Sequence, residues 1–171
     1  MKRLRIQPLT PSAMFLAATL AVGCTSVGPQ SLSPGTAVAE ARRALGKPTG
    51  EYSLPAAGTR LEYATGPYGK QTWMLDFDAK GSLTQVNQVL TEARFNQVLA
   101  GMSKDQVQMN LGRPSEQSLL AFQRQTVWSY RYDGPFCQWF QVGIDARGQV
   151  ADSGYYPDPR CDTKDLGDKN M

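Results

Sequence analysis

The chain carries one sequence pattern twice, and the second copy follows the first by 66 to 68 positions. The phrase ALGKP at 44–48 returns as NLGRP at 110–114, and the phrase DAKG at 78–81 returns as DARG at 145–148. The loop phrases GPY at 66–68 and GPF at 134–136 also match. The offset grows slightly across loops, as expected of a diverged tandem duplication. A chain of this kind is expected to fold into two similar units.

Each copy predicts a short helix that ends at a glycine. In the second copy Ser103 is a suitable N-cap, and Val107 and Leu111 lie four residues apart on one helix face. Gly112 follows, where a positive φ is common, and Pro114 prevents the helix from resuming. The first copy has the same pattern in Ala41, Leu45, Gly46 and Pro48. A further short helix is expected over 91–101, with Thr91 as its N-cap and an apolar face formed by Phe95, Val98 and Leu99.

Alternation of apolar and polar side chains predicts the strands, most clearly over 71–83, 127–132 and 137–150. The phrases at 78–81 and 145–148 begin with aspartate and end with glycine, which is typical of short hairpin connections. The predicted fold class is α+β: two tandem α(α)βββ units, each a short helical segment packed on an antiparallel three-stranded meander. The expected core includes Trp73, Leu75, Phe77, Phe140, Val142, Ile144, Leu45 and Leu111.

The N-terminus resembles a lipoprotein signal sequence. Three basic residues in the first five precede an apolar run of ten residues at 13–22. That run fits a signal peptide and is shorter than the roughly 20 residues that span a bilayer. The phrase AVGC at 21–24 is similar to the bacterial lipobox, which implies a diacylglycerol and an N-acyl chain on Cys24. The lipoprotein sorting rule then implies the outer membrane, because Thr25 is not aspartate. A secreted protein with an incidental cysteine and an uncleaved anchor are the alternatives.

Charge supports removal of this segment. Three of the 18 Lys and Arg residues precede Cys24, and none of the 15 Asp and Glu residues does, so the chain from Cys24 onward has no net charge. Without a basic field, binding to nucleic acid is not expected. The predicted organisation is a signal peptide over 1–23, a lipidated cysteine and flexible tether over 24–34, a first unit over 35–90, a second unit over 91–160 and a polar tail over 161–171.

The two remaining cysteines, Cys137 and Cys161, are expected to form a disulfide in an oxidising periplasm. Two free thiols are the alternative, and a metal pair is disfavoured because the chain has no histidine. In a regular hairpin Cys137 would lie opposite Tyr156. The chain would then have to fold back after Pro157 and Pro159 to bring Cys161 close.

The stretch GMSKDQV at 101–107, followed by LGRP at 111–114, resembles the GMT-x-x-x-V … LGxP signature of the BamE family, also called SmpA/OmlA. The resemblance covers nearly all of the second half and, more weakly, the first, where Thr36 replaces Met102. It implies a small outer-membrane lipoprotein of α-α-β-β-β build, and BamE itself serves the machinery that inserts β-barrel proteins. Two fused units are similar to the β-lactamase inhibitor protein, which has a concave binding face. The resemblance thus implies binding rather than catalysis.

The residues themselves also argue against an enzyme. With no histidine in the chain, Ser-His-Asp and Cys-His sites are excluded. Asp76 and Asp78 share one strand face, but Asp78 is explained by its hairpin. The acidic residues near the C-terminus are typical of a solvated terminus rather than a calcium site: Asp158, Asp162, Asp165 and Asp168. We therefore expect no catalytic residue, no metal and no cofactor other than the acyl chains on Cys24.

The candidate partner-binding residues are aromatic, since aromatic side chains are favoured as interface anchors. They are Trp139, Phe136, Tyr68 and Tyr155. If Phe140 faces the helices, Trp139 and Gln141 point to the opposite sheet face. These rings could instead be covered within the protein. The predicted function is a non-enzymatic, lipid-anchored, periplasm-facing outer-membrane protein that binds an envelope protein such as the β-barrel assembly machinery. The alternative is an inhibitor-like protein that docks on a soluble periplasmic enzyme. Lipid or peptidoglycan binding is a third class, which the absence of a basic cluster disfavours.

Overall fold

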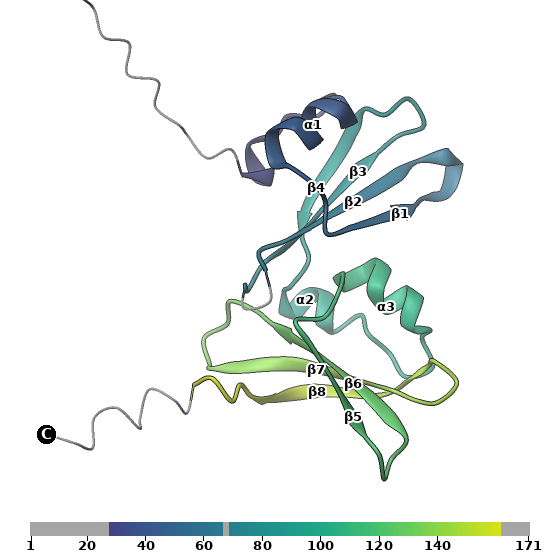
Figure 1. The fold of residues 1–171 in the computed structure, drawn as a ribbon, viewed down its shortest axis with the longest axis vertical. Helices are drawn as coiled ribbons and strands as arrows, with labels where there is room; N and C mark the ends of the chain where they lie inside the picture. The colour runs from purple at the N-terminus through teal and green to yellow at the C-terminus, as the bar shows by residue number, and fades with distance from the viewer. Residues whose placement is uncertain (1–27, 67–68, 162–171) are drawn as a thin grey trace, which may run out of the picture.

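A computed structural model describes residues 28–66 and 69–161. The chain forms two α+β units, each with a four-stranded antiparallel sheet. Figure 1 shows α1 on one face of the first sheet, α2 and α3 between the two sheets, and the second sheet at the end of the stack. The predicted fold class of two tandem α+β units is confirmed, but each meander has four strands rather than three.

The first unit contains η1 (Pro29–Ser31), α1 (Val38–Leu45), β1 (Gly50–Ser53), η2 (Pro55–Ala57), β2 (Thr59–Ala64), β3 (Thr72–Phe77) and β4 (Leu83–Gln88). The second contains α2 (Glu92–Phe95), α3 (Lys104–Leu111), β5 (Glu116–Leu120), β6 (Gln125–Arg131), β7 (Gln138–Ile144) and β8 (Val150–Pro157). Strands pair in sequence order, so β1–β4 form sheet 1 and β5–β8 form sheet 2. The strands that the sequence pattern missed, β1 and β5, are edge strands. Every side chain of β5 is exposed, so this strand has no buried face to produce alternation.

The helix ends follow the repeated pattern. Ser103 and Gln106 form a capping box at the start of α3, which satisfies backbone donors that the first helical turn leaves free. Gly46 and Gly112 have φ of 82° and 80° and close the ends of α1 and α3. The repeated phrase that ends in Gly-x-Pro is therefore a helix stop in both units.

The two predicted hairpins are also present. Asp78 accepts hydrogen bonds at Oδ1 from the backbone N–H groups of Lys80 and Ser82, each at 2.9 Å. Asp145 makes the same pair of bonds in the second unit, and these backbone donors lower the pKa of its carboxyl group. Gly81 closes the first turn with φ of 76°. The structural role expected of Asp78 is confirmed.

Two hydrophobic cores hold the units together. Most of the expected core residues are buried, namely Leu75, Phe77, Phe140, Val142, Ile144 and Leu111. Trp73 and Leu45 are half-buried against the first core. The helix expected over 91–101 is confined to α2. Phe95 and Val98 of this segment are buried, but Leu99 is 62% exposed, so its predicted place on the buried face was wrong. Part of the predicted tether is also packed, since Leu32 lies against the first core.

Helix α3 contacts both sheets. Its Val107 and Leu111 are buried in the second core together with the inner face of sheet 2. On its other side, the guanidinium of Arg60 on β2 donates to the carbonyl oxygen of Met109 at 2.7 Å. The side chain of Met74, on β3, joins the second core across this boundary. The face of sheet 1 that points away from α1, here called the outer face of sheet 1, is therefore covered by the second unit.

Candidate functional site

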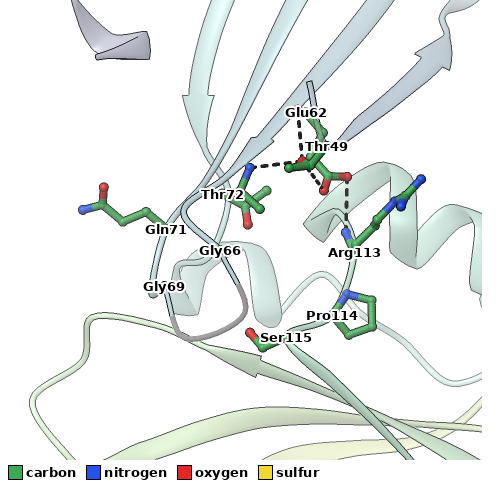
Figure 2. A pocket seen from close by; sticks show the side chains of 10 residues that line it. Thr49, Glu62, Gly66, Gly69, Gln71, Thr72, Arg113, Pro114 and Ser115 are labelled. Atoms are coloured by element: carbon green, nitrogen blue, oxygen red, sulfur yellow. Dashed lines mark hydrogen bonds between the residues drawn. The ribbon is translucent and has the colours of Figure 1, made fainter. Parts of the chain in front are cut away.

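The junction between the units contains a hollow of about 430 Å³ with a carboxylate in its wall. Figure 2 shows Glu62, Thr49 and Arg113 meeting there. Glu62 is fully buried and accepts hydrogen bonds from the Thr49 hydroxyl at 2.9 Å, from the Tyr52 hydroxyl, and from the Arg113 backbone N–H at 3.2 Å. These donors belong to both units, because Arg113 follows α3. Glu62 thus links the first unit to the second.

The neighbours of Glu62 fit this linking role. Burial, reinforced by the hydrogen bond to Glu62, raises the pKa of Tyr52 to about 12. Gly112 lies so close to the first unit that an added Cβ would come within 2.9 Å of Thr72 Cγ2 and 3.1 Å of the Glu62 carboxyl. Glycine at this position therefore allows the close approach as well as the helix stop. Both carboxylate oxygens of Glu62 are occupied by protein donors, so we assign this hollow to assembly of the two units.

A second candidate surface is the face of sheet 2 that points away from the helices, here called the outer face of sheet 2. Trp139 and Gln141 lie on it, as the alternation with Phe140 predicted. Trp139 is nevertheless only 7% exposed. The guanidinium carbon of Arg131 lies 5.0 Å from the centroid of its ring, in a cation–π contact. Trp139 therefore has the predicted direction, but its ring is covered rather than presented to a partner.

Arg131 is held over this ring by a buried ion pair. Its Nε donates to Asp158 Oδ2 at 2.7 Å, and its second terminal nitrogen donates to Oδ1 at 3.3 Å. Both residues are buried, and Glu116 lies 3.7 Å from the guanidinium at the exposed edge. The expectation that Asp158 belongs to a solvated acidic terminus was wrong. The other three aspartates of that expectation, Asp162, Asp165 and Asp168, lie outside the described residues.

The disulfide closes the same corner. Cys137 and Cys161 are bridged, with their Cα atoms 6.1 Å apart. The observed register pairs Trp139, and not Cys137, with Tyr156, so the predicted pairing was wrong by two residues. The carbonyl of Cys137 accepts from the Asp158 N–H at 3.3 Å. A turn at 158–161 then brings the second sulfur back, as the need for a fold-back implied. The bridge therefore ties down the turn that carries the partner of Arg131.

Farther along, the outer face of sheet 2 contains a hollow of about 280 Å³. Val127 and Gly143 face each other across β6 and β7 at its floor. Asp152 on β8 lies beside the glycine and accepts from the Gln125 amide at 3.5 Å. The remaining lining residues are Leu120, Gln123, Gln141 and Tyr156. The side chains of Asp152 and Gln125 pack directly over Gly143, since a Cβ added at this glycine would come within 2.6 Å of Asp152 Oδ1 and 3.0 Å of Gln125 Oε1.

An apolar cluster lies at the end of the β5–β6 hairpin, which projects away from the rest of the second unit (Figure 1). Leu119 is 73% exposed, Leu120 is partly exposed and Phe122 is fully exposed. We call these three residues the apolar tip. The alternation pattern did not predict them, although the run LLAF at 119–122 has no counterpart at the matching place in the first copy. Large apolar side chains gathered on an exposed hairpin are typical of an interaction site.

The remaining predicted partner-binding residues lie apart from this tip. Phe136 is 70% exposed, in the loop between β6 and β7. Tyr155 is 38% exposed and packs against Phe140 and Phe95 at the edge of the second core, with ring centroids 5.3 and 6.2 Å away. Tyr68 and the proposed lipidation site Cys24 lie outside the described residues.

Two further findings concern only residues 28–66 and 69–161. No group of three or more His, Cys, Asp or Glu side chains there is arranged to hold a metal ion. None of the helices in the same part of the chain has the length and apolar character needed to cross a membrane.

Asp76, the carboxylate considered for catalysis, is bound by Arg60, whose Nε donates to its Oδ1 at 2.6 Å. Its oxygens therefore serve an ion pair beside the unit junction.

Comparisons with known proteins add one likeness. No protein-family model and no curated protein sequence matches the chain. Among solved structures, a candidate beta-lactamase inhibitor protein from Streptococcus mutans is similar, with a TM-score of 0.31 and 12% sequence identity over 77% of this chain and 88% of that one. A TM-score this low does not establish a shared fold, so function has to be inferred from the residues of this chain.

Proposed function

We propose that this protein is a non-enzymatic, lipid-anchored protein of the outer membrane that faces the periplasm and binds another envelope protein through its apolar tip. The observation that carries the proposal is the exposure of Leu119, Leu120 and Phe122 together on one hairpin. Burying one such side chain in an interface contributes about 1.5–3 kcal/mol. A rigid aromatic ring flanked by leucines is a suitable anchor for a partner pocket.

The membrane part of the proposal is supported by the N-terminal sequence. The basic start, the short apolar run and the Gly-Cys pair at 23–24 favour acylation of Cys24. One acyl chain alone binds membranes reversibly, whereas the diacylglycerol and N-acyl chain of a lipoprotein together give stable anchoring. The BamE-like signature at 101–114 favours the β-barrel assembly machinery as the partner.

The non-enzymatic part is supported by the side chains that are available. The chain has no histidine, and Glu62, Asp76 and Asp158 all accept hydrogen bonds from other groups of the protein. An acid–base pair needs carboxyl groups that can reach a substrate. We therefore infer a binding role with no cofactor beyond the acyl chains.

Site-specific photo-crosslinking in living cells tests the proposal. The probe replaces Phe122, Leu119 or Phe136 in turn, and Lys80 serves as a control because it is exposed on the β3–β4 hairpin of the other unit. We expect a discrete adduct with an outer-membrane barrel protein from Phe122 and Leu119 and none from Lys80. If the folded, lipidated protein gives no adduct at the tip, the proposed surface is wrong.

The alternative function is inhibition of a soluble periplasmic enzyme. One observation favours it: a fully exposed phenylalanine at the end of a projecting hairpin has the shape of a side chain that enters an enzyme cleft. In that case the adduct from Phe122 would contain a soluble enzyme, and removal of the acyl chains would not weaken binding. A barrel partner in the membrane would instead be lost from pull-downs when Cys24→Ser prevents anchoring.

A further inference from the structure

Each unit of this chain has a helix on one face of its sheet. In sheet 1 the outer face is covered as well, by the second unit. Helix α3 docks there through its C-terminal end. Arg60 donates to the Met109 carbonyl at 2.7 Å, the Arg113 N–H donates to Glu62 at 3.2 Å, and Gly112 lies against Thr72. The contact of a helix end with the outer face of a sheet is therefore a stable part of this fold.

Helix α1 is the counterpart of α3 in the repeat, so its far side has a similar backbone shape. Both helices have eight residues and end in Leu-Gly-x-Pro, and the glycine of each closes the helix with a positive φ. The residues of α1 at the positions of Asp105, Met109, Gly112 and Arg113 are Ala39, Arg43, Gly46 and Lys47. All four are exposed. Helix α1 thus presents an open surface equivalent to the one that α3 uses.

The outer face of sheet 2 is in turn the counterpart of the face that α3 covers. The facing pair Arg60 and Asp76 of sheet 1 corresponds by the repeat and the register to Val127 and Gly143. Val127 and Gly143 line the hollow of about 280 Å³. A helix that approaches sheet 2 as α3 approaches sheet 1 would meet this hollow.

The charges of the two open surfaces are opposite. Helix α1 presents Arg43 and Lys47, and Ala39 stands where α3 has an acid. The outer face of sheet 2 presents the exposed carboxylates of Glu116 and Asp152. Opposite charges at the rim of a contact favour encounter and fix its register.

We propose that a second copy of this chain occupies the end of the outer face of sheet 2 that contains the hollow, with its α1 packed over Val127 and Gly143 as α3 packs over Arg60 and Asp76. Ser129 and Trp139, the counterparts of Glu62 and Thr72, are already buried within the chain and lie outside this contact. This inference goes beyond the proposed function and does not depend on it. The two surfaces meet at Leu120, which belongs to the apolar tip and also lines the hollow, whereas Leu119 and Phe122 do not line it. The contact is heterologous: each added copy leaves one α1 and one sheet 2 face free, so the assembly grows head to tail. The surfaces are largely polar, so the contact is weak and salt-sensitive.

Sedimentation of the purified full chain in detergent tests the inference over a concentration range up to about 1 mM, where weak contacts are populated. We expect the weight-average mass of the protein to rise with concentration and to fall when salt is added. Arg43→Glu and Asp152→Lys should each weaken the association about tenfold, equal to about 1.4 kcal/mol. The double variant should recover much of it, since the opposite charges are restored in exchanged positions.

Controls separate this contact from other causes. Lys104→Glu changes an exposed charge at the start of α3, which lies on the inner side of sheet 2, and should leave association unchanged. Phe122→Ser should leave association unchanged while abolishing the partner adduct of the probe at Leu119. This variant therefore distinguishes failure of this inference from failure of the proposed function. Lys47→Glu is a second variant of α1 in case Arg43→Glu alters the circular dichroism spectrum. A protein that stays monomeric throughout, or associates equally in the Arg43, Lys47 and Asp152 variants, overturns the inference.

Discussion

Replacement of Glu62 by alanine should loosen the junction between the two units. The carboxylate accepts hydrogen bonds from the Thr49 hydroxyl, the Tyr52 hydroxyl and the Arg113 N–H. Without it, the Thr49 hydroxyl still donates to the backbone carbonyl of residue 62 at 3.1 Å, and the Tyr52 hydroxyl still accepts from Gln108 at 3.2 Å. The Tyr52 O–H and the Arg113 N–H both lose the acceptor that the carboxylate provides. The damage is therefore concentrated at the contact between the units.

The expected loss of unfolding free energy is about 3 kcal/mol. Leaving a buried donor without an acceptor costs about 1–3 kcal/mol, and lost hydrogen bonds to a charged group contribute about 1.5–3 kcal/mol each. The sum is reduced because the variant no longer buries a carboxylate and because water can enter the enlarged hollow. Glu62→Gln should cost only about 1 kcal/mol, since its amide oxygen can still accept from Tyr52 and Arg113.

Equilibrium unfolding in urea, followed by tryptophan fluorescence and far-ultraviolet circular dichroism, measures these differences. Glu51→Ala is the matched control, because Glu51 is an exposed glutamate of the same sheet whose ion pair with Arg42 should contribute less than about 1 kcal/mol. If Glu62→Ala and Glu51→Ala unfold at the same urea concentration, the assignment of Glu62 to the junction is refuted.

Three further outcomes follow from the second unit and from the tyrosines. Asp158→Ala should lower the free energy of unfolding by about 3 kcal/mol, because Arg131 stays buried without its bidentate acceptor. Acrylamide should then quench the fluorescence of Trp139 more strongly. The control Glu116→Ala should change little in either measurement. Replacing both Cys137 and Cys161 by serine should lower stability by roughly 3 kcal/mol, and a reductant should then destabilise the wild type but not the variant. The raised pKa of Tyr52, about 12, means that the folded state keeps this phenol protonated where the unfolded chain ionises near pH 10. Its stabilising contribution is therefore complete below pH 10 and is lost between pH 10 and 12. Tyr52→Phe should reduce this fall of stability with rising pH. A wild-type stability that stays constant to pH 12 would contradict the assignment.

The sequence by itself was sufficient for features that short segments encode. The cap at Ser103, the stops at Gly46 and Gly112, and the hairpins at Asp78 and Asp145 are present as predicted. Each depends on hydrogen bonds and backbone angles within about five residues, so the local sequence carries the information. The repeat then placed the same elements in both halves and indicated an α+β fold with two units.

The tertiary structure decided which surfaces are covered. Strand β5 forms because β6 supplies its hydrogen bonds, and its exposed side chains leave no alternation in the sequence. The direction of Trp139 was predictable from the period of two, but its burial depends on Arg131 and Asp158, which are 27 positions apart in the chain. Glu62 is joined to Arg113 across 51 positions in the same way. Local patterns determine backbone conformation and facing, whereas burial and pairing depend on what distant residues bring to the same place, and only the packed chain supplies that.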